Sequence, residues 1–494
     1  MKLARFFLLP LACLGLQSAS ADCYRIETIP FPEGVPPEVG AIGFSPAGKL
    51  FVALRRSDVL VAEPQEDPTK FSWKLFASGL HNACGIEVIS DKEIVVSQMA
   101  ELTRIVDTDG DGVGDQYEAI SAAWGMSGNY HETNHIVPDG KGGWFAAVGT
   151  ASHNGPVFYN IRGDYSKIGR RGRNFSAASW KGWVLHIDSK GEATPWASGF
   201  RMHNGILLDS KGRLWAGDNQ GDWKGTTPLY HVEKGHFYGH VSSLVWDPKW
   251  EQGKDPLEVP IAEIDALRTR AAVLMPHNEI NRSAAEPMEI PEGDEFGPFG
   301  GQLLVADNNG KRITRVMIEK VGGAFQGACA HFYNENGIQL GNNRLAFSPD
   351  KSTLYVGQTS RGWGQIAEGL QRIIYTGETP FDVKRMTLTD TGFALEFTTD
   401  LGDNAVPASQ FSMSRYRYED TGEYGSGKHD ASEVEIAAVR RTGSNVLELD
   451  IPKLEDGGWL YELRITPFRD ARQVDLRTDL ICYTVNRLRG QAAK

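Results

Sequence analysis

The chain has 494 residues, of which 41% are hydrophobic and 23% charged, with 55 glycines and 12 tryptophans. A formal net charge of -12 argues against nucleic acid or an anionic membrane surface as a partner. The chain is too long for one ordinary domain, and its composition suits a turn-rich β protein with a large core.

The first 21 residues have the pattern of a secretory signal peptide. Lys2 and Arg5 precede an apolar run at residues 6–16, and Ala19-Ser20-Ala21 supplies small residues for cleavage. We expect cleavage after Ala21 and a secreted or periplasmic mature protein. No later stretch is long and apolar enough to span a bilayer, so no transmembrane segment is expected.

Cleavage leaves four cysteines, Cys23, Cys84, Cys329 and Cys482. An exported protein meets an oxidising compartment, where disulfides are permitted. None of the four is close enough to another for a C-x-x-C redox or metal motif. We expect one or two bridges or buried thiols, and the pairing stays open.

A polar turn followed by a short apolar run recurs six times, at residues 44–54, 89–98, 137–150, 208–219, 296–308 and 347–359. Asp, Gly, Pro and Lys supply the turn, and β-branched and aromatic residues supply the strand. One such unit cannot bury its own faces, so the copies must stack as modules. The repeats predict an all-β fold, a six-bladed β-propeller over residues 22–382, with residues 24–40 giving an outer strand that closes the ring.

The segment DTDGDGVGDQYE, residues 107–118, matches D-x-D-x-D-G-x5-E at every position. Calcium takes six to eight oxygen ligands at flexible geometry. The expected ligands are the side chains of Asp107, Asp109, Asp111, Asp115 and Glu118 and the carbonyl of Val113. The flanks have a strand-like pattern, so we predict a structural calcium clip and not a sensor.

Nine of the 12 histidines lie between residues 131 and 277. Most sit at loop positions beside the recurring strands. This distribution suggests a pocket for proton transfer, sugar binding or a transition metal.

The sequence pattern changes near residue 384, after which apolar and polar residues alternate in short runs separated by turn residues. It predicts a small C-terminal β-sandwich of immunoglobulin or fibronectin type over residues 383–494. Two roles are possible for this domain: a packing module or a carbohydrate-contacting module.

Four segments, residues 128–150, 198–223, 228–240 and 341–364, resemble the soluble quinoprotein glucose and sorbosone dehydrogenases. The resemblance extends over residues 40–380. It implies a secreted propeller that oxidises a carbohydrate with pyrroloquinoline quinone (PQQ) and passes electrons to an external acceptor.

The resemblance also implies roles for single residues. His131 matches the base that abstracts the sugar hydroxyl proton, and Arg201 matches an arginine over the quinone. Gln220-Gly221 matches a pair at the quinone and calcium site, and Arg344 matches an arginine that binds a quinone carboxylate.

Four positions depart from the family pattern: Thr150, Met202, Asn308 or Asn309, and Asn342 stand where the family has its Asp, Asn, Lys and first Arg. Cationic partners of the tricarboxylate are thereby lost. Lys311, Arg312 and Arg361 are the candidates that replace them.

The alternative is a non-redox carbohydrate-active propeller, a lyase or hydrolase that degrades a polysaccharide. His131, His135, His203, Tyr130 and Arg201 would do base and charge-neutralising work on a uronic or sulfated sugar. Three or four histidines could instead hold a transition metal. A sugar-binding propeller without catalysis is a third possibility, and the basic stretch 170–175 could contact an acidic polymer.

Overall fold

The computed structural model describes residues 23–127, 133–152, 161–334, 337–359, 366–403 and 406–490. Strands make up 46% of it and helices 6%, so the all-β prediction is confirmed. Over these ranges we find no helix with both the length and the hydrophobicity needed to cross a bilayer.

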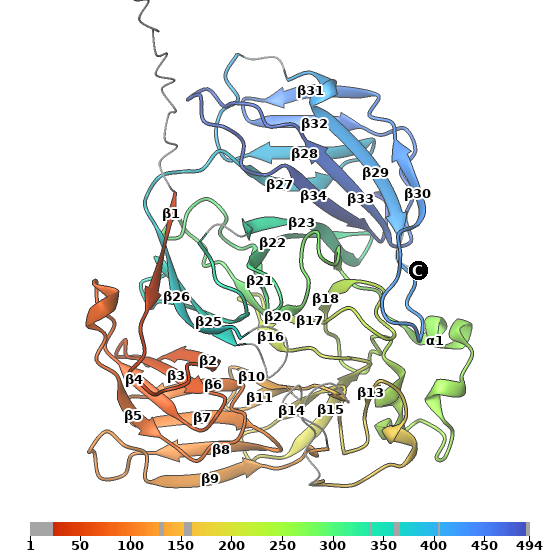
Figure 1. Ribbon diagram of the computed structural model, residues 1–494. Coiled ribbons are helices and arrows are strands. Elements are labelled where there is room, and N and C mark those ends of the chain that lie inside the picture. The colour runs from red at the N-terminus through yellow and green to blue at the C-terminus, as the bar shows by residue number, and fades with distance from the viewer. Residues whose placement is uncertain are drawn as a thin grey trace, which may run out of the picture.

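Six sets of four antiparallel strands, sheets 1 to 6, follow one another along the chain (Figure 1). Sheets 1 and 2 are β2 (Val39–Phe44), β3 (Leu50–Leu54), β4 (Val59–Ala62) and β5 (Lys74–Ala77), then β6 (Gly85–Ser90), β7 (Glu93–Gln98), β8 (Glu101–Val106) and β9 (Gln116–Ser121). Sheets 3 and 4 are β10 (Asn134–Pro138), β11 (Trp144–Val148), β14 (Trp183–Ile187) and β15 (Ala193–Ser198), then β16 (Gly205–Leu208), β17 (Leu214–Gly217), β18 (Thr227–His231) and β19 (Val273–Met275). Sheets 5 and 6 are β20 (Ala284–Glu289), β21 (Leu303–Asp307), β22 (Arg312–Val321) and β23 (Ala324–Asn334), then β24 (Asn342–Phe347), β25 (Thr353–Thr359), β26 (Glu368–Tyr375) and β1 (Tyr24–Ile29).

The first strands of the six sheets contact one another in a cycle. β2 contacts β6, β6 contacts β10, and the contacts continue through β16, β20 and β24 back to β2. β1 pairs with β26, with Tyr24 opposite Tyr375, so the N-terminal strand is the outer strand of sheet 6, as predicted for residues 24–40. This cyclic order is the one that a six-bladed propeller requires, while the blade count itself stays a prediction.

The recurring turns share one pattern of hydrogen bonds. Asp188 Oδ1 accepts the main-chain N–H groups of Lys190 (2.9 Å) and Glu192 (3.0 Å). Asp209 Oδ1 does the same for Lys211 (2.9 Å) and Arg213 (2.8 Å). Gly191 and Gly212, three residues after each aspartate, have φ angles of 84° and 71°, which a side chain would strain. The aspartate and the glycine together explain why the recurring sequence forms the same tight turn at both places.

The C-terminal residues form two further antiparallel sheet layers that face each other. One layer is β27 (Val383–Leu388), β28 (Gly392–Phe397), β32 (Val446–Asp450) and β31 (Ala438–Gly443), and the other is β34 (Leu480–Val485), β33 (Trp459–Ile465), β29 (Phe411–Arg417) and β30 (His429–Val434). One buried hydrophobic core, which includes Phe393, Leu447 and Tyr461, fills the space between them. The immunoglobulin or fibronectin type and the boundary at residue 383 stay predictions.

The C-terminal strands are joined to sheet 5. β34 pairs with β23, so one sheet of eight strands runs from sheet 5 into the C-terminal part, the blue region of Figure 1. At this seam Cys329 lies opposite Cys482, and both side chains are buried. Cys84, Cys329 and Cys482 are buried thiols, which is one of the two forms that the sequence left open.

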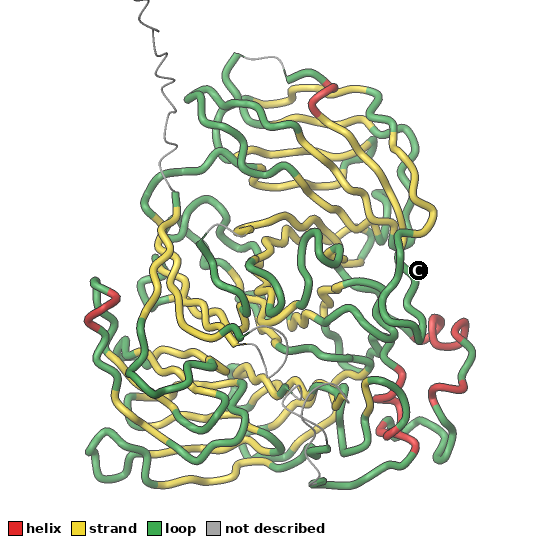
Figure 2. Tube along the Cα trace, viewed as in Figure 1, coloured by secondary structure: helices red, strands yellow, loops and turns green. Residues whose placement is uncertain are grey.

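Helical segments are few and short (Figure 2). Three of them, η3 (Val241–Trp246), η4 (Pro256–Glu258) and α1 (Ile261–Leu267), lie between β18 and β19. η3 packs on sheet 3, where the Trp183 indole donates to the Ser243 carbonyl (2.9 Å). The remaining short elements are η1 (Pro68–Lys70), η2 (Ile168–Arg170), η5 (Ala408–Gln410), β12 (Ala151–Ser152) and β13 (Asn174–Phe175).

Candidate functional site

Arg201 lies in the loop between β15 and β16, and its side chain is only 5% exposed. Its Nε donates to Asp222 Oδ1 (2.7 Å), and its Nη2 donates to Asn174 Oδ1 (2.7 Å). Its main-chain N–H donates to Asp218 Oδ2 (2.8 Å). Three separate segments of the chain therefore meet at this one arginine.

Gly221 lies against Arg201, and Gln220 precedes it in the same turn. A Cβ atom on residue 221 would come within 2.2 Å of Arg201 Cζ, so only glycine leaves room for the guanidinium. The Gln220 side chain donates to the Gly225 carbonyl (3.2 Å) and closes the turn that carries both residues.

Asp222 is shared between Arg201 and His240. His240 Nε2 lies 3.4 Å from Asp222 Oδ2. Burial opposes ionisation of Asp222, but His240 and Arg201 together hold the pKa of its carboxyl well below the ordinary value. Burial lowers the pKa of His240, so its imidazole is neutral. With Nε2–H donated to Asp222, His240 Nδ1 carries a lone pair and, within the described residues, has no hydrogen-bond partner.

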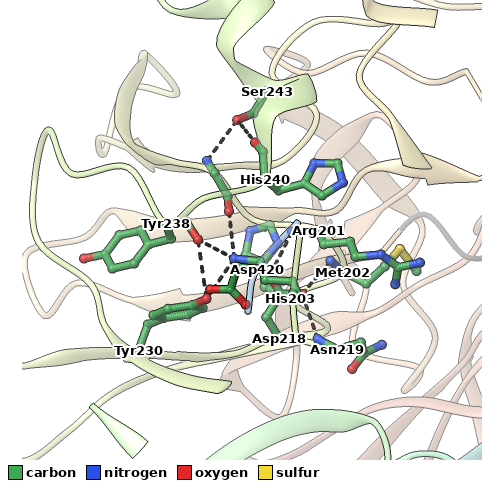
Figure 3. Close-up of polar contacts among 12 residues, drawn as sticks. Arg201, Met202, His203, Asp218, Asn219, Tyr230, Tyr238, His240, Ser243 and Asp420 are labelled. Carbon is green, nitrogen blue, oxygen red and sulfur yellow. Dashed lines mark hydrogen bonds and ion pairs between the residues drawn. The ribbon is translucent and has the colours of Figure 1, made fainter. Parts of the chain in front are cut away.

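A second buried cation, Lys224, holds the same loops together. Its partners Asp218, Tyr230 and Tyr238 are labelled in Figure 3. Lys224 Nζ lies 3.5 Å from Asp218 Oδ2 and donates to the Gly199 carbonyl (3.0 Å) and to the Tyr230 hydroxyl (2.9 Å). It also donates to the carbonyl of Tyr238. Burial lowers the pKa of Lys224 to about 8, against the carboxylate of Asp218. Lys224 positions the loops and faces no open site.

His203, a predicted catalytic residue, has structural contacts. Its ring stacks on Phe200 with centroids 4.4 Å apart, and Nε2 donates to the Trp183 carbonyl (3.0 Å). Burial lowers its pKa to about 4, so the ring stays neutral.

Arg344 and His135 belong to a separate buried cluster at the inner strands. Arg344 Nε and Nη2 donate to the carbonyl of Cys84 (3.0 and 2.7 Å). His135 Nε2 lies 3.4 Å from Glu286 Oε1, and its Nδ1 accepts the Ile206 N–H (3.2 Å). These bonds join the first strands of different sheets, so both residues have contacts that hold the ring together.

The other predicted site residues are dispersed or not placed. His131, Tyr130 and Arg361 lie outside the described residues. Arg312 donates to the Asn278 carbonyl (2.6 Å) and to Asn334 (3.2 Å), and Lys311 is exposed beside it. The contacts of Arg312 are with its own sheet and the loop before it, and not with Arg201 or Arg344.

The acidic loop joins β8 to β9, and three of its carboxylates converge. Oxygens of Asp107, Asp109 and Asp111 lie within 4.8 Å of one another. Asp115 instead accepts hydrogen bonds from Thr108 (2.8 Å), and Glu118, on β9, faces Arg104 (3.8 Å). Val113 lies in the same turn and is 41% exposed.

Among the described residues, these three aspartates are the only such gathering of histidine, cysteine or carboxylate groups. The placed histidines have separate partners, such as Glu286 for His135 and Asp139 for His186 (2.8 Å). The transition-metal hypothesis gains no support from them.

Sequence reasoning missed the partners of Arg201. Asn174, Asp218, Asp222, Lys224 and His240 complete the cluster, and none of them was singled out for it. A signal was present, because the run Asp218-Asn219-Gln220-Gly221-Asp222 directly follows the buried strand β17. Two carboxylates in that position need buried partners.

No family model matches the chain, and no curated protein matches it. Among solved structures, the chain is similar to the PQQ domain of pyranose dehydrogenase from Coprinopsis cinerea, at 15% identity over 72% of this chain and 96% of the other, with a TM-score of 0.50. It is also similar to a Trichoderma reesei carbohydrate-active enzyme of family AA12, at 12% identity over 72% of this chain and 97% of the other, with a TM-score of 0.51. The fold is that of the sugar dehydrogenase propellers.

In this propeller the Arg201 cluster is built from the loops β15–β16, β17–β18 and β18–β19, with Asn174 from β13. Sheet 3 and sheet 4 thus supply most of the candidate site.

Proposed function

We propose that this chain is an exported carbohydrate-active enzyme, a six-bladed sugar dehydrogenase-like propeller that works at the Arg201 cluster. The fold and the cyclic contacts of the inner strands support the architecture. The N-terminal segment supports export. The observation that carries the site is the buried Arg201–Asp222–His240 network, in which His240 Nδ1 has no partner among the described residues, because such an atom needs a ligand, a water or a substrate.

The chemistry of these residues follows from their charges. Asp222 orients the His240 imidazole, which leaves Nδ1 able to accept a proton. Arg201, whose charge is balanced by Asp222, would bind an oxygen of a sugar through its remaining N–H groups. His131 is the base that the family resemblance implies. A dehydrogenase would also have to move a hydride from the hydroxyl-bearing carbon to an electron acceptor, and these residues would supply only the base.

The residues that the resemblance assigns to PQQ do not fit that group as they are arranged. The quinone is a planar tricarboxylate, which needs cationic donors that are free to bind it. Arg201 is paired with Asp222 and Asn174, and Arg344 is buried against the Cys84 carbonyl. Asn308 takes the place of a lysine and donates to the Thr359 carbonyl (3.0 Å).

A titration of the purified mature protein with PQQ and calcium tests the redox form of the proposal. Saturable binding in the absorbance spectrum, with sugar-dependent reduction of an artificial dye, is the expected result for a quinoprotein dehydrogenase. Arg201→Gln should abolish dye reduction, while Arg385→Gln, at an exposed position on β27, should leave it unchanged. Quinone that does not bind, with no dye reduced by any aldose, would exclude the dehydrogenase.

The poor fit of the quinone favours a second candidate, a lyase or hydrolase that degrades an acidic polysaccharide. Here His240 or His131 would act as base beside the Arg201–Asp222 pair. New ultraviolet absorbance from an unsaturated product would identify a lyase, and new reducing ends without it would identify a hydrolase.

We also propose calcium as the structural ion of the 107–118 loop. Asp107, Asp109 and Asp111 would bind it, with adjustment of Asp115 and Glu118 toward the ion. Chelation should lower the thermal unfolding temperature of the wild type, and Asp109→Asn should remove that response. Asp58→Asn, outside the loop, should keep it. An unfolding temperature that ignores both chelator and calcium would contradict a calcium clip.

A further inference from the structure

The loop between β29 and β30, residues 418–428, reaches from the C-terminal sandwich to the Arg201 cluster. The Trp223 N–H donates to the Thr421 carbonyl (2.6 Å), and the Gly425 N–H donates to the Gly221 carbonyl (3.1 Å). The 418–428 loop is thus bonded directly to the turn that holds Gly221 and Asp222.

That turn is held in a strained conformation. Trp223 has a φ of 63°, a region that bulky side chains rarely adopt, and its ring is buried. Asp420 anchors the loop beside it, because its carboxylate pairs with Arg268 (2.6 Å) and accepts the Gly225 N–H (2.6 Å). The C-terminal part therefore fixes the geometry of the candidate site.

The same loop brings an aromatic ring to the site. The Arg201 Cζ lies 5.3 Å from the centroid of the Tyr424 ring, and the Arg173 Cζ lies 4.4 Å from it. Tyr424 is 49% exposed, so part of the ring remains open to solvent. Arg173 is exposed as well.

The two arginines differ in whether a carboxylate balances their charge. Arg201 is paired with Asp222, whose other oxygen faces His240. Within the described ranges no carboxylate pairs with Arg173. A guanidinium in this state binds a carboxylate through two parallel hydrogen bonds, and the part of the Tyr424 ring that the two arginines leave exposed offers an apolar surface to a sugar ring.

We propose that Tyr424 and Arg173 form a subsite for a carboxylated sugar, a uronate. The sugar ring packs on Tyr424, and its carboxylate binds Arg173. This inference rests on the proposed carbohydrate function and names its substrate class. It also assigns the C-terminal sandwich a direct part in substrate binding.

Calorimetric binding of D-glucuronate and D-glucose to the full mature chain tests the subsite, because the two sugars differ only at the carboxylate carbon. Glucuronate should bind about tenfold or more tightly than glucose, the usual size of a charged hydrogen bond. Arg173→Ala should remove this preference, and Tyr424→Ala should weaken glucuronate binding by about threefold to tenfold, while Tyr424→Phe retains it.

Matched controls are Arg385→Ala, an exposed arginine on β27, and Tyr117→Ala, a tyrosine on β9 that is 45% exposed. Both should bind like wild type. Equal binding of the two sugars, binding of neither, or a preference that survives Arg173→Ala would overturn the subsite. Turnover of neutral sugars alongside such a result would leave the proposed function standing. Glucuronate binding without turnover of any carbohydrate would keep the subsite and remove the enzyme proposal.

Discussion

Residue 221 decides whether Arg201 can occupy its place. Gly221→Ala would put a Cβ atom 2.2 Å from Arg201 Cζ, so the guanidinium must move away from Asp222. We expect a loss of about 1–3 kcal/mol in the free energy of unfolding, the usual cost of overpacking, together with loss of activity. Denaturant-induced unfolding measures the loss in the free energy of unfolding. Gly427→Ala, where a Cβ meets nothing within 4 Å, should cost much less, and equal costs would contradict the steric argument.

His203 predicts a dependence of stability on pH. Its folded pKa is about 4 because of burial, whereas the unfolded value is about 6.5. Between these values the unfolded chain binds a proton that the folded chain refuses, so stability falls as the pH drops from 6.5 to 4. The contribution of His203 is on the order of 3 kcal/mol.

The measurement is the free energy of unfolding at pH 7 and at pH 4.5 for wild type and His203→Gln. Glutamine keeps a donor for the Trp183 carbonyl but does not titrate in this range. The difference between the two pH values should be smaller in the variant. If the variant loses as much stability between pH 7 and pH 4.5 as the wild type does, other groups account for the pH dependence.

At the level of the elements, the pairing of β23 with β34 predicts how two buried thiols react. Burial raises the pKa of the Cys482 thiol well above its ordinary value, so the thiolate is scarce. We expect Cys329 and Cys482 to resist alkylation in the folded protein and to react after unfolding. Mass spectrometry of alkylated peptides, without a reducing agent, checks this. A disulfide between them in the mature protein would contradict the thiol form.

Sequence patterns predicted the strands because their signals are local. An aspartate with a glycine three residues later, as at Asp188 and Asp209, specifies a turn without help from distant residues. The partners of Arg201 were not predictable in this way. Asn174, Asp222 and His240 come from different loops, and no periodicity states which loops will meet. The acidic loop shows a further limit, since Glu118 fits the motif but lies on β9 opposite Arg104.

For the whole molecule, the eight-stranded sheet predicts one cooperative unfolding transition. Leu460 packs in a buried cluster with Trp215 of sheet 4 and Val305 of sheet 5, and Leu447 belongs to the sandwich core, which also takes in Met317 of sheet 5. If the two parts unfold together, Leu460→Ala and Leu447→Ala should each lower the same single transition, by about 2–5 kcal/mol.

Differential scanning calorimetry makes that comparison. Two transitions in the wild type, with Leu447→Ala moving only one of them, would show that the C-terminal sandwich is thermodynamically independent. The subsite at Tyr424 would then depend on a part of the protein that can open without unfolding the propeller.

Because β1 pairs with β26, sheet 6 can be completed only late in biosynthesis. The strand β1 has no strand partner until residues 368–375 have been made, because Tyr24 pairs with Tyr375. Such distant partners make closure a late and slow event, with an unpaired edge waiting in the meantime. Sheet 6 therefore stays incomplete until all but the C-terminal sandwich has been made.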